Sequence, residues 1–157
     1  MDEVTKKYSA LDITDRIFNL AKNNDGLVTD LTNLKLQKIL FYAQGWFAAN
    51  KDQRLFEDDI EAWPLGPVVV KVYERFKSDG AANLVELVAD EEIKVDEDKV
   101  VDTFLEQLLG IYGKMSAYEL VARTHEEEVW KKNSVSLNKL MPFDDIKKAF
   151  KLKLVES

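Results

Sequence analysis

The densest run of apolar side chains lies between residues 32 and 50 and recurs at helical spacing. One stripe comprises Leu36, Leu40, Ala43 and Phe47, and a second stripe beside it comprises Leu34, Ile39, Tyr42 and Trp46. Two apolar stripes leave little polar face, so the pattern predicts a central helix that is buried on most sides, with Thr32 as its N-cap. Its polar members are then either a narrow solvent stripe or buried groups with specific partners: Lys35, Gln37, Lys38 and Gln44.

Shorter amphipathic helices are predicted on both sides of the central helix. The first begins at Ser9, where Asp12 can complete a capping box, and ends at the turn-forming run 23–26. Pro67 suits the first position of a helix, because its missing amide has no partner there in any case. The remaining helices are expected at residues 67–76, from a cap at Asp98 or Asp96 to Gly113, at 116–124 and at 142–150. Residues 126–130 are expected to form a further short helix or turn.

The segments between these helices lack a helical period. Residues 55–63 are expected to form a short β-hairpin or an extended segment. Residues 84–95 alternate weakly and are either one or two short strands or a continued loop. Residues 1–8 and 151–157 are expected to be flexible. The fold class is therefore mainly α (α+β at most), a compact helical bundle around the central helix, in a single domain over residues 1–157.

Composition narrows the classes of function. The chain of 157 residues is 46% hydrophobic and 32% charged, which suits one globular domain with a sizeable core. Its net charge of −7 opposes non-specific attraction to phosphate backbones, so a nucleic-acid partner is not expected. The acidic balance favours a basic protein partner, or it simply keeps the chain soluble. We see no signal region and no apolar run of membrane-spanning length, so a cytoplasmic protein without a membrane partner is expected.

The chain has few side chains suited to catalysis or metal binding. It has no cysteine, which excludes disulfides and thiolate chemistry, and one histidine, which removes most metal sites. The run 125–128, His-Glu-Glu-Glu, suggests a zinc-protease helix, but that motif needs a second histidine. The six glycines lack the spacing of a phosphate-binding loop. We therefore predict no catalytic residue, no cofactor and no metal.

His125 nevertheless admits two interpretations. With Glu127 it could act as a base and its orienting carboxylate. The alternative is a structural histidine that hydrogen-bonds the backbone or the segment 63–68, which is compatible with stacking against Trp130. The sequence favours the structural interpretation, because no thiol, second histidine or evident nucleophile accompanies His125.

Three further sets of residues have alternative roles. Lys35 and Lys38 could form a polar pocket with Gln37 and Glu61, or they could be a solvent stripe or structural ion pairs. The tryptophans could anchor an interface or pack in the core, and core packing is expected for Trp46. Three acidic runs, at residues 57–59, 90–92 and 126–128, are read as solvated faces that could also meet a basic partner.

Three motifs together resemble a known family. The first is Leu-Thr-Asn-Leu-Lys-Leu-Gln-Lys at 31–38 with Tyr-Ala-Gln-Gly-Trp at 42–46. The second is Glu-Ala-Trp-Pro-Leu-Gly-Pro-Val-Val at 61–69 with Val-Tyr at 72–73, and the third is Thr-His-Glu-Glu-Glu-Val-Trp at 124–130. Their order and spacing resemble the Panacea antitoxin domain, a phage-associated family that includes SocA-like and GepA-like proteins. One departure is Val129, which stands where the family usually has proline.

The resemblance implies a non-enzymatic antitoxin of a toxin–antitoxin pair or prophage module, which neutralises a cognate toxin by direct binding. An alternative is an adaptor that delivers the toxin to a Clp-type protease, and another is a small hydrolase-like enzyme that uses His125 and Glu127. The motif residues then have interaction or structural roles: Lys35, Gln37, Lys38, Trp63, Gly66, Pro67, Tyr73, His125, Glu127 and Trp130. The identity of the toxin, its contact surface and a homo-oligomeric state stay open.

Overall fold

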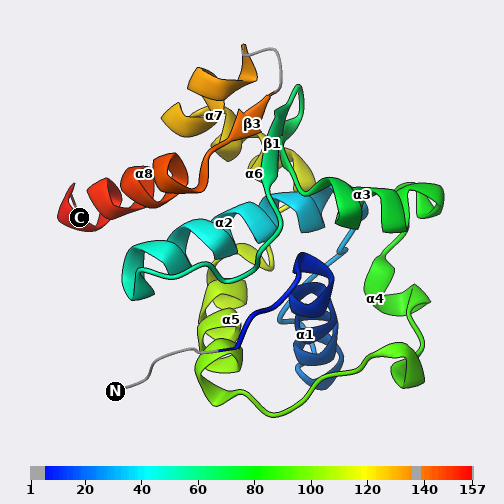
Figure 1. Cartoon of the computed structure of the whole chain (residues 1–157). Helices are drawn as coiled ribbons and strands as arrows, with labels where there is room; N and C mark the ends of the chain where they lie inside the picture. The colour runs from blue at the N-terminus through cyan, green and yellow to red at the C-terminus, as the bar shows by residue number, and fades with distance from the viewer. Residues whose placement is uncertain (1–5, 136–138, 157) are drawn as a thin grey trace.

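The computed structural model describes residues 6–135 and 139–156, which form mostly helices with one small sheet (Figure 1). The helices are α1 (Ala10–Asn23), α2 (Asn33–Lys51), α3 (Val70–Phe76), α4 (Leu84–Leu87), α5 (Lys99–Tyr112), α6 (Ala117–His125), α7 (Glu128–Ser134) and α8 (Phe143–Glu156). Short 3₁₀ helices cover Lys77–Asp79 and Asp90–Glu92. The strands are β1 (Ile60–Trp63), β2 (Gly66–Val68) and β3 (Leu140–Met141). The predicted mainly α fold is confirmed.

Helix α2 is the centre of the molecule, as its double apolar stripe predicts. It packs against α8, α6, β2, α3 and α5. Fifteen of its 19 residues are buried, so nearly every side of the helix faces another element. Trp46, which was expected in the core, stays half-buried at the margin of the core.

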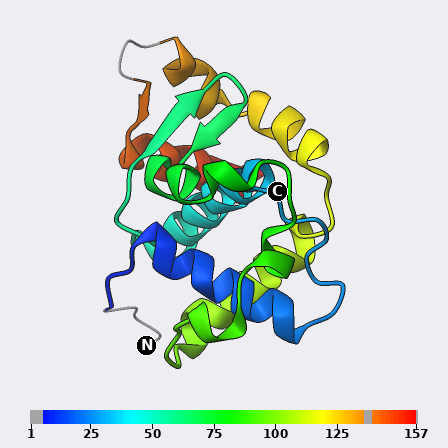
Figure 2. The same cartoon turned by 90° about the vertical axis from the view of Figure 1, so that its right-hand side faces the viewer.

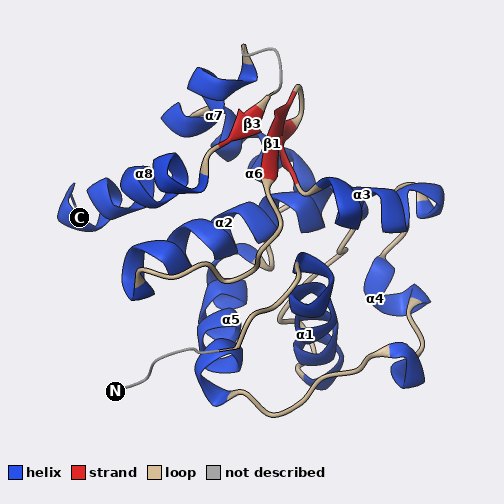
Figure 3. Cartoon of the chain, in the orientation of Figure 1, coloured by secondary structure: helices blue, strands red, loops and turns tan. Residues whose placement is uncertain are grey.

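The other elements cover α2 from different sides. In Figure 1, α8 and the small sheet lie above α2, whereas α1 and α5 lie below it. Turning the molecule brings α1 to the front, with the hairpin above it (Figure 2). Figure 3 shows that the strands occupy one corner of the molecule, next to α6 and α7.

The sheet has the order β2–β1–β3 and is antiparallel throughout. Its hairpin spans residues 60–68, so the predicted hairpin exists but lies further along the chain than 55–63. Pro67 belongs to β2, paired with Ala62, and is not the first residue of a helix as predicted. Proline is tolerated here because β2 is an edge strand, where a missing amide breaks no ladder bond.

Two other expectations about local structure are wrong. Residues 84–95 form α4 and a 3₁₀ helix joined by loop, and not the strands or the continued loop that were expected. The Asn83 side chain caps α4 at the Val85 amide. Helix α8 continues to Glu156 and does not end at Phe150. The two-residue strand β3 went unpredicted, since so short an element has no periodicity.

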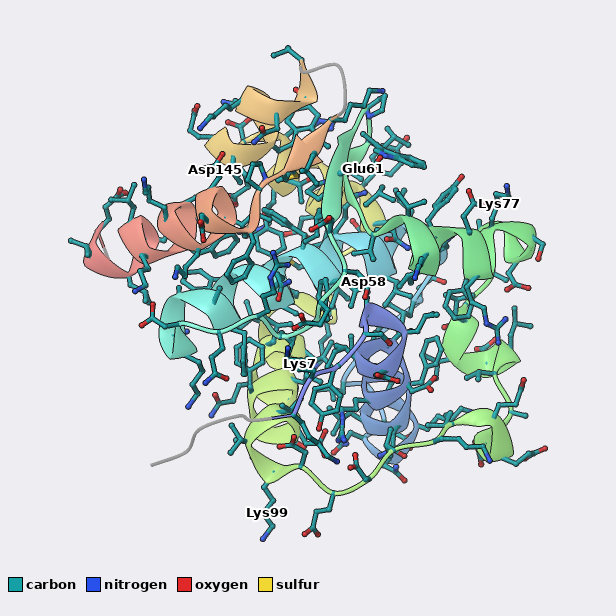
Figure 4. All side chains as sticks on the ribbon, in the orientation of Figure 1. Lys7, Asp58, Glu61, Lys77, Lys99 and Asp145 are labelled. Carbon is teal, nitrogen blue, oxygen red and sulfur yellow. The ribbon has the colours of Figure 1, made fainter. Side chains whose placement is uncertain are left out.

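Side-chain caps begin several of the predicted helices. Ser9 and Asp12 form the reciprocal capping box of α1. Asp58 also accepts from the Ala10 amide at 2.7 Å. Figure 4 shows Asp58 at the start of α1. Thr32, Asp98 and Ser116 each accept from the amide three residues on, at 3.2, 3.2 and 3.0 Å. At the N-terminus, Tyr8 is buried and its hydroxyl donates to Asp98, so the expected flexibility does not reach this residue. Residues 1–5 and Ser157 lie outside the described residues.

Gly45 sets how closely α2 and α8 approach. A Cβ atom at this position would lie 2.3 Å from the ring of Phe150, which is fully buried. Phe150 in turn packs edge-on against Phe41 at 5.4 Å and Trp46 at 5.0 Å, so the ring has little freedom to move.

We therefore expect Gly45→Ala to lower the free energy of unfolding by about 1–3 kcal/mol, measured by urea denaturation, because the core is overpacked. The matched control is Gly110→Ala in α5, where a Cβ atom would meet nothing within 4 Å. That change should raise stability by about 0.5–1 kcal/mol, the helix preference of alanine over glycine. If both variants gain stability, the close approach does not constrain the fold.

Candidate functional site

Polar side chains on the first half of α2 hold the segment that leads from β2 into α3. The Gln37 carbonyl oxygen accepts from the Val69 amide at 2.9 Å, and its amide nitrogen donates to Asn33 at 2.8 Å. Asn33 in turn donates to the Tyr73 carbonyl oxygen at 3.1 Å. Asn33 and Gln37 are four residues apart and share one face of the helix, which lets them act as a unit.

Lys38 continues this set of contacts. Its ammonium nitrogen donates to the Pro67 carbonyl oxygen at 3.0 Å, and its side chain is fully buried. Within the described residues no carboxylate pairs with it, and burial lowers the pKa of Lys38 to about 7. Lys38 is thus a buried amine that holds β2 by a single hydrogen bond to the backbone.

Gly66 makes room for Lys38. Its φ of +114° is a backbone conformation that side chains rarely permit. A Cβ atom at Gly66 would lie 2.6 Å from Thr124 Oγ1 and 3.0 Å from Lys38 Cε. The glycine of the second motif therefore allows α2, β2 and α6 to meet.

Lys35 lies apart from Lys38. Its ammonium group donates to the Thr29 carbonyl oxygen and, at 2.6 Å, to the Gly113 carbonyl oxygen, so it joins α2 to the end of α5. Burial also lowers the pKa of Lys35. Glu61 accepts from Trp63 at 2.9 Å instead of from a lysine. The predicted polar pocket of Lys35, Lys38, Gln37 and Glu61 is therefore wrong. Lys38 and Gln37 do both hydrogen-bond the backbone of residues 67–69.

Aromatic rings cover the outer side of the hairpin. His125 Nε2 donates to the Pro64 carbonyl oxygen at 2.9 Å, and its ring stacks on Trp130 with centroids 4.3 Å apart. Trp130 donates to the Trp63 carbonyl oxygen at 2.9 Å, and Trp63 packs edge-on against Tyr73 at 5.1 Å. The contacts expected for a structural His125 are observed. They join α6 and α7 to the β1–β2 turn.

Glu127 bonds away from His125. It accepts from the Tyr42 hydroxyl at 3.0 Å and forms an ion pair with Lys153 at 2.6 Å. Burial raises the pKa of Tyr42, and the negative charge of Glu127 adds to the rise. Tyr42 also stacks on Tyr112 at 4.5 Å. Glu127 therefore ties the α6–α7 corner to α2 and α8 and does not orient His125 as a base.

Several motif residues reach the surface around the hairpin tip. We call this surface the hairpin patch; it comprises Trp63, Pro64, Leu65, Tyr73, His125 and Trp130. Leu65 is 57% exposed and Pro64 is exposed, whereas the aromatic side chains are half-buried. Half-buried aromatic rings around an exposed leucine are suited to contact with another protein.

The described residues contain neither a cluster of metal-ligating side chains nor a membrane-spanning helix. Among residues 6–135 and 139–156, no three His, Asp or Glu side chains are grouped so that they could hold a metal ion. The described helices are also too short or too polar to cross a bilayer.

The sequence does not predict the roles of three residues in these networks. Asn33 and Tyr42 fit motif or core positions, and their hydrogen bonds to residues 40 and 85 positions away leave no local signal. Lys153 lies in the segment that was expected to be flexible. The spacing of Asn33 and Gln37 was the one available clue, because an amide pair four residues apart on a buried face needs partners.

The family model described as "Antitoxin SocA-like, Panacea domain" matches residues 36–131. Antitoxin SocA of Caulobacter vibrioides (strain NA1000 / CB15N) is 32% identical over 103 residues, which cover 60% of this chain. The chain spans only 55% of the length of that relative. No solved structure matches. The matched range holds nine of the ten motif residues, from Gln37 to Trp130, and leaves out Lys35 and helix α8.

The buried amine of Lys38 gives a test of the hairpin attachment. Its pKa is lower in the folded chain than the usual 10.5, so the unfolded chain binds more protons between pH 7 and 10.5, and stability rises with pH in that window. Between pH 7 and pH 9 we expect the wild type to gain about 2 kcal/mol relative to Lys38→Met, measured by urea unfolding at both values. A difference between the two proteins that stays constant with pH would show that Lys38 is not a buried amine.

Proposed function

Because the chain belongs to the SocA-like antitoxin family with the Panacea domain, we propose that it is an antitoxin that neutralises a cognate toxin by direct protein–protein binding. The observation that carries the proposal is the family match over residues 36–131. This range contains α2, the hairpin and the α6–α7 corner, the elements that the motif residues hold together.

The use of the potentially reactive side chains supports a binding role. His125, Glu127 and Lys38 are each engaged in contacts that fix one element against another. Such residues contribute shape and rigidity, and a rigid scaffold reduces the entropy lost when a partner docks. The hydrolase hypothesis needs His125 and Glu127 to act together, whereas these two side chains bond to different elements.

The motif residues mainly build the scaffold, so the choice of toxin would rest with the exposed surface. The hairpin patch is one surface of this kind, with Glu126 and Glu128 beside it at 82% and 86% exposure. Exposed carboxylates beside aromatic rings favour a partner with basic residues, which they would also attract over a distance.

The direct test is co-expression with the protein encoded by the adjacent reading frame. We expect that frame to stop growth when expressed alone, and this chain to restore growth and to co-purify with its product at a ratio near one to one. Protection should persist in a strain that lacks Clp proteases, because a bound inhibitor needs no proteolysis. Protection only where the protease is present would favour the adaptor, and protection in neither strain would contradict the antitoxin role.

His125→Ala separates a structural from a catalytic histidine. We expect it to lose about 1–2 kcal/mol of unfolding free energy, through the lost hydrogen bond to Pro64 and the lost stacking on Trp130, while still protecting cells at low temperature. Urea unfolding and growth rescue measure the two effects. A variant that keeps full stability and toxin binding but no longer protects would instead assign chemistry to His125.

A further inference from the structure

A groove of about 680 Å³ lies between the C-terminal half of α2 and helix α5, away from the hairpin patch. Its apolar floor is formed by Trp46 of α2 together with one row of side chains on α5: Val100, Phe104, Leu108 and Ile111. Leu108 is buried at the base of the row, whereas Val100 and Phe104 are half-buried. At one end of the row, Ile111 is 60% exposed.

The row has the spacing of a helix-docking seam. Its members are four, four and three residues apart, so they follow one face of α5. From Lys99 to Ile111 the helix rises by about 18 Å, which matches about three turns of a second helix laid alongside it. Seams of this kind typically accept the apolar face of an amphipathic helix.

The walls of the groove are already rigid. The Trp46 indole nitrogen donates to Tyr112 at 2.9 Å, and its ring packs edge-on against Phe150 at 5.0 Å. Phe104 packs in the same way against Phe47 at 5.1 Å. Trp46 therefore presents its ring to the groove with its polar atom satisfied, and a ligand would meet a preformed apolar surface.

The charge of the groove is unlike that of the chain. The chain has a net charge of −7, yet among the described residues that line the groove none is acidic and two are lysines, Lys51 and Lys99. Neither lysine forms an ion pair within the described residues, whereas the neighbouring Asp52 and Asp102 are paired with Lys151 and Arg16. Figure 4 shows Lys99 pointing into solvent at the lower end of α5.

We propose that this groove binds an amphipathic helix of the toxin, with an apolar inward face and acidic residues that meet Lys51 and Lys99. The inference rests on the proposed antitoxin function and names the segment of the partner that is recognised. A second copy of this chain is a poor occupant, because a two-fold contact would bring the same unpaired lysines of both copies into one interface.

The test uses the wild-type chain and its variants with the toxin from the adjacent reading frame, by biolayer interferometry. Ile111→Asp places a charge in the seam at an exposed position, and we expect binding at least about tenfold weaker. Leu87→Asp is the matched control, since Leu87 is 56% exposed but lies on α4, and its affinity should be unchanged. Circular dichroism checks that both variants stay folded.

A double charge reversal tests the two lysines independently of the apolar row. Lys51→Glu with Lys99→Glu should slow association and flatten its dependence on salt. Lys71→Glu with Lys94→Glu makes the same change in net charge at exposed positions outside the groove, and should have a much smaller effect. Benzoylphenylalanine at Thr103, which also lines the groove, should crosslink to an acidic amphipathic segment of the toxin.

The outcomes separate the two proposals. If the wild type does not bind the toxin, the antitoxin role fails and this inference fails with it. If the wild type binds and the groove variants behave like their controls, only the groove assignment is overturned. A crosslink from Thr103 to a second copy of this chain, or to a basic segment of the toxin, would likewise overturn it.

Discussion

The burial of polar side chains along α2 is the constraint on which the rest of the structure depends. An amide or ammonium group in the core costs several kcal/mol unless it finds a partner. On α2 the partners are backbone groups of the covering segments: Gln37 holds Val69, Lys38 holds Pro67, and Gln44 holds both Leu55 and Phe56. Among the described residues, every buried side-chain nitrogen and oxygen has a hydrogen-bond partner. The central helix thus determines where its irregular neighbours lie.

This arrangement separates the scaffold from the surfaces that remain for recognition. The hairpin and the α6–α7 corner are joined by hydrogen bonds from His125 and Trp130, and Glu127 joins that corner to α2 and α8. A frame fixed in this way can keep its shape while exposed residues differ. The proposed role in binding toxins and the proposed groove between α2 and α5 both need such a frame, because each relies on preformed shape instead of chemistry.

The sequence predicted what depends on local pattern and missed what depends on distant partners. The double apolar stripe of α2 and the caps at Ser9 and Thr32 are local, and they were predicted. The cap of α5 was left between Asp98 and Asp96, and the structure has Asp98. Pro67 fits either a helix start or an edge strand, and pairing with β1 decides for the strand. The length of α8 was underestimated because its last residues alternate lysine with exposed apolar side chains, a pattern that shows no buried face.

The sequence likewise predicted only some of the contacts in the candidate site. The structural interpretation of His125 allowed a hydrogen bond to the backbone or to the segment 63–68 and was compatible with stacking on Trp130. The structure shows a bond to the Pro64 carbonyl oxygen and the stacking. The roles of Tyr42 and Lys153 could not be foreseen, since their common partner Glu127 is 85 and 26 residues away. No period or spacing within a single element encodes a contact of that range.

Amide hydrogen exchange of Leu55 and Val69 tests the central claim most directly. Both amides lie outside the helices, and both donate to glutamine side chains of α2. If those side chains fix the covering segments, both amides should exchange only through global unfolding, with opening free energies within about 1 kcal/mol of those of the α2 backbone. Exchange at the rate of exposed loop amides would show that the covering segments open independently, and would contradict the account.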